Sequence, residues 1–200
     1  VWPRAELFRF FSAVSQRFTA SPSRVDVTNL HAYARPWRFL LLCAGVSGDR
    51  CGQRRGDFRY TIRSGEVWLL DERVPSFTDL KPGSQQFHIV TLPKEGGLDS
   101  FCRTTRAQKR SPADLSGPER RVGRSDLLFL YTVVRPDRLH QRAGLDKDDN
   151  IPRITWGKYV PADGRETLGM CLEVNHRFVD GWHLGQFYQH LQQAIDALKI

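Results

Sequence analysis

The stretch that most constrains this chain is a histidine placed between a short apolar segment and a periodic helix near the C-terminus. Residues 172–176 alternate apolar and polar side chains, and an Asp180-Gly181 turn follows His176. Beyond the turn, apolar residues recur at helical spacing: Leu184, Phe187, Tyr188, Leu191, Ile195 and Leu198. This pattern predicts a strand, a tight turn and an amphipathic helix with one buried face. A titratable imidazole is therefore expected where a strand ends, with Asn175 on the opposite face of that strand.

The size and composition of the chain predict one well-cored domain spanning residues 1–200. Two hundred residues, 40% of them hydrophobic, suffice for one core but are few for two. No apolar run approaches the roughly 18 residues needed to cross a bilayer, so we expect no membrane span. The cysteines form neither a C-x-x-C pair nor a finger-like group with histidine, which favours reduced thiols in a cytoplasm. They are Cys43, Cys51, Cys102 and Cys171.

The net charge of +8 is carried largely by arginine and admits anionic partners. The arginines are dispersed, and the chain shows neither an RNA-binding aromatic motif nor a helix-turn-helix signal. We therefore expect a phosphorylated small molecule, such as a nucleotide-bearing thioester carrier, rather than nucleic acid.

Two short motifs at opposite ends of the chain resemble one family. His176, Asp180 and Gly181 form an H-x-x-x-D-G pattern, which resembles the signature of chloramphenicol acetyltransferases and of peptide synthetase condensation domains. The family's N-terminal W-x-R-x-x-x-F pattern is matched by Trp2, Arg4 and Phe8. The resemblance implies that His176 is the general base and that Asp180 pairs with Arg4, fixing the turn that aims the ring. In the relatives, the backbone carbonyl of the same histidine holds the ring's tautomer.

Two further segments extend the resemblance over nearly the whole chain. Residues 59–101 follow the family pattern in register and predict a hairpin around Ser64-Gly65. Residues 154–159 match the family's T-x-[AG]-K-Y strand. The resemblance implies an α/β fold, arranged as an α+β two-layer sandwich in which helices pack on a mixed β-sheet. Residues 2–11 are expected to form a helix with Pro3 in its first turn.

The resemblance also implies roles for residues outside the two short motifs. Thr132, in the buried strand predicted at 127–134, would donate a hydrogen bond to the oxyanion. Thr155 would lie near the reacting centre, and Lys158 with Arg38 would face the phosphates of the carrier. The acceptor pocket would be lined by four aromatic residues: Phe10, Phe11, Phe18 and Phe101.

The expected function is acyl transfer from a CoA-type thioester, such as acetyl-CoA, to a hydroxyl or amine of a small molecule. No G-x-S-x-G elbow is visible, so we expect a ternary complex without an acyl-enzyme. The relatives form trimers, and a homotrimer is expected here. Asn175 stands where the family has a second histidine, and Phe11 where relatives often have tyrosine. Antibiotic resistance and a biosynthetic role therefore both stay open.

Three other interpretations are open at this point. The basic surface would suit a condensing or cyclising enzyme of natural-product biosynthesis that takes its acyl group from an acidic carrier protein. The altered pocket would suit a catalytically silent member that binds a ligand. An H-x-x-x-D-x-x-H pattern, formed by His176, Asp180 and His183, could hold a metal, but the Asp-Gly turn breaks regular helix spacing, and we expect no metal.

Overall fold

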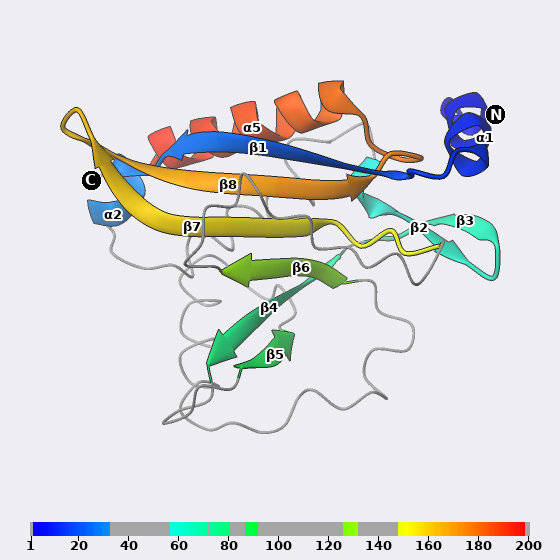
Figure 1. The fold of residues 1–200 in the computed structure, drawn as a ribbon, viewed down its shortest axis with the longest axis horizontal. Helices are drawn as coiled ribbons and strands as arrows, with labels where there is room; N and C mark the ends of the chain where they lie inside the picture. The colour runs from blue at the N-terminus through cyan, green and yellow to red at the C-terminus, as the bar shows by residue number, and fades with distance from the viewer. Residues whose placement is uncertain are drawn as a thin grey trace.

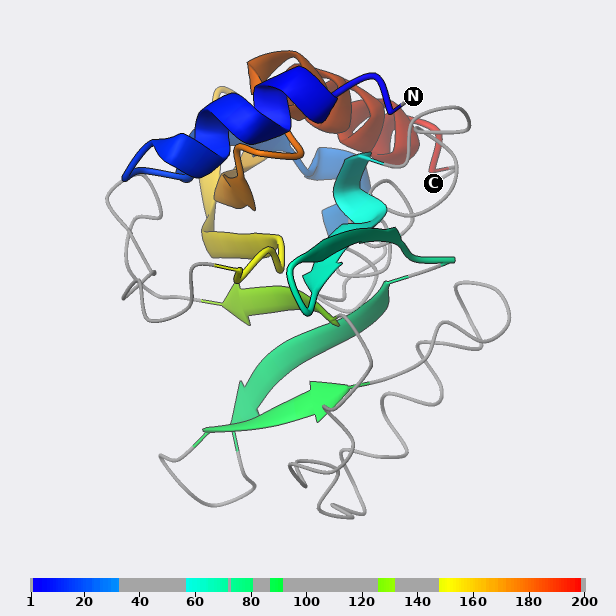
Figure 2. The ribbon, with the colours of Figure 1, turned by 90° about the vertical axis from the view of Figure 1, so that its right-hand side faces the viewer.

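The computed structural model describes residues 2–32, 57–71, 73–80, 87–91, 126–131 and 148–198. Within these residues a six-stranded mixed sheet has the order β1-β8-β7-β6-β4-β5, from top to bottom in Figure 1, and Figure 2 shows the sheet from its end with β6, β4 and β5 lowest. The β4/β6 and β6/β7 pairs are parallel and the others antiparallel. The expected mixed sheet packed by helices is confirmed. The strands are β1 (Phe18–Asp26), β4 (Val74–Leu80), β5 (Phe87–Thr91), β6 (Asp126–Tyr131), β7 (Arg153–Ala162) and β8 (Arg165–Asn175).

Three helices accompany the sheet in the described residues. Helix α5 (Gly181–Asp196) runs along β1 and β8, and α2 (Thr28–Ala32) packs against β8 and α5 (Figure 1). Helix α1 (Ala5–Ala13) lies at the end of the sheet where β8 finishes (Figure 1). It begins at Ala5 with Arg4 at its N-cap, so Pro3 precedes the helix rather than lying in its first turn. None of the helices described here has the length and apolar content to cross a membrane.

The hydrophobic core lies between α5 and one face of β7 and β8. Alternate residues of β8 face it and are fully buried, because successive side chains of a strand point to opposite faces; they are Leu168, Met170, Leu172 and Val174. Helix α5 contributes the spacing predicted from the sequence, through Leu184, Phe187, Leu191 and Ile195. Toward its end β8 is buried on both faces, since Cys171, Glu173 and Asn175 are also covered. Cys171 is a free thiol, and the other three cysteines lie outside the described residues.

A separate two-stranded hairpin packs beside the N-terminus. It consists of η1 (Asp57–Arg59), β2 (Tyr60–Arg63) and β3 (Glu66–Leu69). Ser64 and Gly65 have φ angles of 52° and 80°, the left-handed pair that a tight two-residue hairpin turn requires, so the predicted hairpin is confirmed. The ring of Tyr60 lies 5.0 Å from that of Trp2 and 5.9 Å from that of Phe178. The hairpin thus packs against both the start of the chain and the segment after β8.

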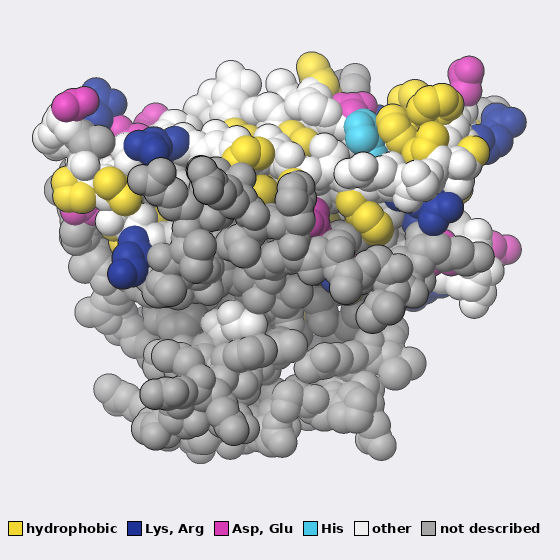
Figure 3. Space-filling view, in the orientation of Figure 1, with side chains coloured by type: hydrophobic (Ala, Val, Ile, Leu, Met, Phe, Trp, Pro, Cys, Tyr) yellow, Lys and Arg dark blue, Asp and Glu magenta, His cyan; other side chains and the backbone are white. Residues whose placement is uncertain are grey.

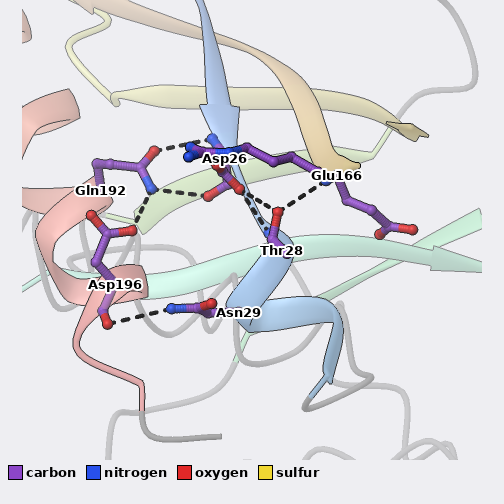
Figure 4. A network of polar contacts seen from close by, with 7 residues as sticks. Asp26, Thr28, Asn29, Glu166, Gln192 and Asp196 are labelled. Atoms are coloured by element: carbon purple, nitrogen blue, oxygen red, sulfur yellow. Dashed lines mark hydrogen bonds and ion pairs between the residues drawn. The ribbon is translucent and has the colours of Figure 1, made fainter. Parts of the chain in front are cut away.

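A polar network fastens α5 to the far end of β1 (Figure 4). The side-chain amide of Gln192 accepts a hydrogen bond from the backbone N–H of Asp26 at 3.0 Å and donates to its carbonyl at 3.0 Å. It also donates to Asp196 at 2.9 Å. The carboxylate of Asp26 accepts hydrogen bonds from the backbone N–H and the hydroxyl of Thr28. The hydroxyl oxygen of Thr28 in turn accepts from the backbone N–H of Glu166. This network places α5 lengthwise along the strand pair.

Replacing Gln192 with Ala should destabilise the fold by about 1–3 kcal/mol, because both backbone groups of Asp26 lose their partner. Urea unfolding of Gln192→Ala measures the change. The matched control is Gln193→Ala, on the exposed side of the same helix turn, which should change stability by less than about 0.5 kcal/mol. Equal effects of the two substitutions would contradict the proposed fastening.

Candidate active site

The histidine segment is a strand, a turn and a capped helix, as the sequence predicts. Strand β8 ends at Asn175, a turn covers residues 176–178, and α5 begins at Gly181. The Asp180 carboxylate accepts hydrogen bonds from the N–H groups of Trp182 and His183, at 3.1 and 3.4 Å. In return, the Nδ1 atom of His183 lies 3.2 Å from the Asp180 N–H, which completes a capping box. The turn is therefore joined rigidly to the first turn of a core helix.

His183 belongs to this cap. Its Nδ1 atom is also 2.6 Å from the Asp180 carboxylate, so the ring is in direct contact with the residue that caps the helix. Among the residues that the structure describes, no group of three His, Cys, Asp or Glu side chains has the arrangement of a metal site. The three polar residues of the H-x-x-x-D-x-x-H pattern thus have contacts within the protein that serve the turn and the helix.

The predicted ion pair between Arg4 and Asp180 is present. The guanidinium of Arg4 lies 2.7 Å from the carboxylate of Asp180, with side-chain exposures of 9% and 30%. A second guanidinium nitrogen donates to the backbone carbonyl of His176 at 3.4 Å. Burial alone would raise the pKa of Asp180, but the hydrogen bond from Arg4 and the charges of His183 and Arg4 outweigh it and hold that pKa below its usual value. One arginine therefore ties both ends of the histidine turn.

Aromatic packing explains the spacing of the N-terminal motif. The ring of Trp2 lies 5.5 Å from that of Phe8, and Phe8 lies 5.5 Å from Phe178, which belongs to the histidine turn. Such tilted ring pairs add to the free energy of simple burial. Because Trp2 and Phe8 pack around the turn, Arg4 between them is directed at Asp180.

The His176 ring is half-buried and lies flat against Phe11. The two ring centroids are 4.0 Å apart with planes inclined by 14°. The backbone N–H of His176 donates to the carbonyl of Arg17 at 2.6 Å. The Nδ1 atom is buried and has no hydrogen-bond partner among the described residues. Ring orientation here therefore depends on the backbone of the turn and on stacking.

The predicted acceptor-pocket aromatics of the N-terminal region gather at this end of the molecule. Phe10 is 61% exposed and meets Phe11 edge-on at 5.1 Å. Phe18 is half-buried and lies opposite Asn175 in the β1–β8 ladder. Figure 3 shows a group of hydrophobic side chains at this end of the molecule. An apolar surface thus adjoins the imidazole.

Thr155 and Lys158 lie farther along the sheet. Thr155 is buried and pairs with Cys171, five residues before His176, which corresponds to about 17 Å of strand. Lys158 is exposed at the irregularity between Trp156 and Tyr159, farther again from the turn. At these positions of the ladder neither residue reaches the imidazole within a single chain, and the expectation that Thr155 lies near the reacting centre stays a prediction.

Three predicted site residues, Arg38, Phe101 and Thr132, lie outside the described residues. The strand predicted at 127–134 is confirmed as far as Tyr131, the last residue of β6. Asn175, which the sequence placed on the opposite face of the strand, and Arg177, which sequence reasoning passed over, prove to be buried beside His176, at 2% and 4% exposure. The available signal was a run of three polar residues, 175–177, between apolar Val174 and apolar Phe178.

Replacing Asp180 with Asn keeps a helix-capping side chain but removes the charge that pairs with Arg4. We expect a loss of about 2–3 kcal/mol at neutral pH, below the range for fully buried pairs because Asp180 is partly exposed. The folded pKa of Asp180 is lower than the unfolded one, so its contribution is complete above about pH 4 and is lost as the pH falls through the folded pKa.

The stability difference between wild type and Asp180→Asn should therefore shrink below about pH 4, as measured by urea unfolding across pH. Glu6→Gln, the same charge change at an exposed position of α1, serves as the control and should have little effect. A difference that does not vary with pH would show that the carboxylate charge contributes nothing.

Comparison with known proteins points to one group. No family model matches the chain. The chloramphenicol acetyltransferase of Clostridium perfringens is 24% identical over 204 residues, covering 98% of this chain and 95% of that protein. Chloramphenicol acetyltransferase 3 of Escherichia coli is also 24% identical, covering 98% and 94%. A solved chloramphenicol acetyltransferase structure matches with a TM-score of 0.84 at 20% identity, over 98% of this chain and 96% of that one. In sequence over nearly its whole length, and in fold, this chain is chloramphenicol acetyltransferase-like.

Proposed function

We propose that this protein is an acyltransferase that moves an acyl group from a CoA-type thioester to a hydroxyl or amine of a small molecule. The observation that carries the proposal is the Arg4 guanidinium, which contacts both the His176 carbonyl and the Asp180 carboxylate. Full-length relatives named chloramphenicol acetyltransferase support acyl transfer as the reaction class. The acceptor is a small molecule, and chloramphenicol is one candidate.

His176 acts as the general base in this proposal. The neutral imidazole takes the proton of the acceptor hydroxyl or amine while the acceptor atom attacks the thioester carbonyl carbon. The tetrahedral oxyanion then collapses, the carbon–sulfur bond breaks, and the imidazolium returns its proton to the thiolate. General-base catalysis of this kind contributes about 10²–10⁴-fold to the rate. Thr132 is the proposed donor to the oxyanion.

Asp180 has an architectural role rather than that of a triad carboxylate. Its two oxygens are engaged by Arg4, by the N–H groups at the start of α5 and by the His183 ring. A carboxylate that orients a catalytic imidazole would instead have to reach the Nδ1 atom of His176, which has no partner among the described residues. Asp180 therefore acts on catalysis by holding the turn.

The separation of the site residues supports a homotrimer with shared sites. Thr155 and Lys158 lie too far from His176 along the sheet to serve the same substrate atoms within one chain. Contributions from two copies would bring them together, because a symmetric ring repeats the same interface around its axis. Lys158, exposed and cationic, then contacts the phosphates of the donor together with Arg38, while Thr155 and Phe101 line the neighbouring half of the pocket.

The His176→Gln variant should lower acyl transfer by about 10²–10⁴-fold without a change in unfolding midpoint. The assay follows thiol release from acetyl-CoA with a panel of alcohol and amine acceptors that includes chloramphenicol, and repeats it with an acyl carrier protein as the donor. His190→Gln, a half-buried histidine of α5 away from the turn, is the matched control. Turnover at the wild-type rate in His176→Gln would contradict the assignment of His176 as the base. If the wild-type protein binds acyl-CoA tightly without turnover, the result would favour a catalytically silent, ligand-binding member of the family.

The oligomer is tested separately by light scattering. We expect a mass of three copies of the 23.0 kDa chain. Coexpressed His176→Gln and Thr155→Val chains should regain activity when mixed trimers form, because one site in each mixed trimer can receive both wild-type residues. A fully active monomer would contradict the shared site.

A further inference from the structure

The two residues that flank His176 are polar and more deeply buried than the histidine. Asn175 is 2% and Arg177 4% exposed, whereas His176 is half-buried. Burial of an amide and a guanidinium is unfavourable unless hydrogen bonds replace those to water. Each of these two side chains therefore needs hydrogen-bond partners inside the protein. Those partners show which segments Asn175 and Arg177 hold in place.

Asn175 bonds in both directions from its side chain. Its amide oxygen accepts from the backbone N–H of Arg177 at 3.0 Å and from the Nε atom of Arg177 at 3.2 Å. Its amide nitrogen donates to the carbonyl of Asp149 at 2.9 Å. Its own carbonyl accepts from the N–H groups of Phe178 and Val179, at 3.1 and 3.2 Å. Asn175 thus joins the start of the histidine turn to the backbone of residues 177–179 and to Asp149.

Arg177 extends this anchoring to a second segment. Its guanidinium lies 3.4 Å from the carboxylate of Asp148 and 5.4 Å from the centre of the Phe8 ring. The segment that supplies these acceptors is itself held, because Asn150 donates to the carbonyl of Asp148 at 2.8 Å and accepts from Arg73 at 3.4 Å. Arg73 in turn donates to the carbonyl of Tyr60 at 2.7 Å. The chain of contacts runs from the hairpin to the residues on either side of His176.

We propose that Asn175 and Arg177 are positioning residues for His176, a claim that rests on the proposed role of that histidine as the base. Arg4 holds the carbonyl side of the turn, and the Asn175–Arg177 pair holds the turn through a different set of contacts. The Nδ1 atom of His176 has no hydrogen-bond partner in the described part of the chain. The position of the ring is therefore set by the backbone of the histidine turn and by the stacking contact with Phe11. Small displacements of a catalytic group can cost about 10²-fold in rate.

The test combines kinetics with a direct measure of the histidine. Asn175→Ala should lower kcat by about 10–100-fold and change the KM for acetyl-CoA by less than about twofold. Asn175→Asp keeps an oxygen for Arg177 and loses the donor to Asp149, so it should retain more of kcat than Asn175→Ala. Arg177→Met, which keeps the length of the side chain, should resemble Asn175→Ala and provides a second variant if that protein does not fold.

The second readout is the rate at which diethyl pyrocarbonate modifies His176, followed by mass spectrometry. It should rise several-fold in Asn175→Ala and Arg177→Met, while the rate at His190 in the same molecules stays unchanged. Gln192→Ala, which removes a similar number of hydrogen bonds at the far end of β1, should leave kcat and the His176 rate as in wild type.

Wild-type kcat and wild-type His176 reactivity in both Asn175→Ala and Arg177→Met would overturn the proposal. Equal changes in Gln192→Ala would also overturn it, by tracing them to global stability. If wild-type protein transfers no acyl group, the proposed function fails, and the modification rates alone then decide whether the pair positions the ring.

Discussion

The contact on which the site depends is the Arg4 guanidinium between the His176 carbonyl and the Asp180 carboxylate. The two charged residues are 176 positions apart, so the contact joins the beginning of the chain to its last helix. It is not what brings these ends together. The β1–β8 ladder and the packing of Trp2 and Phe8 on Phe178 already do so. The ion pair instead selects one orientation of the turn, since charge pairing adds direction where hydrophobic packing has little.

Asp180 serves two structures at once, and this couples the site to the core. Its carboxylate caps α5 and pairs with Arg4, so it offsets both the positive end of the helix and a buried cation. The helix is fixed by buried Leu184, Phe187 and Leu191. Any movement of the histidine turn therefore has to move either a helix packed in the core or the N-terminal aromatic cluster. The proposed general base has no Nδ1 hydrogen bond of its own among the described residues, and rigid supports of this kind are what such a residue would require.

The local sequence pattern predicted secondary-structure elements, but it did not predict the contacts between residues that are far apart in the sequence. Helix α5 followed from apolar spacing and the β2–β3 hairpin from Ser64-Gly65, because each depends on residues close in sequence. The Arg4–Asp180 contact came from family resemblance, since nothing in residue spacing relates positions so far apart. The roles of Asn175 and Arg177 depend on Asp148 and Asp149, more than twenty residues earlier, and alternation treats a polar strand residue as solvent-facing. The irregularity near Lys158 likewise arises in the pairing with β8, not in the β7 sequence alone.

The stacking of Phe11 on His176 shows how the ring can be oriented and still react. A near-parallel aromatic neighbour covers one π face of the imidazole, while the lone pair of the unprotonated nitrogen lies in the ring plane and stays free of that contact. The stack therefore restricts rotation of the ring without using a proton-accepting atom. A tyrosine at this position would add a hydroxyl near the histidine, and phenylalanine adds none. Under the proposed function, an acceptor beside Phe10 and Phe11 therefore meets a hydrophobic surface on this side, and its polar groups other than the reacting one need partners elsewhere in the pocket or stay in water.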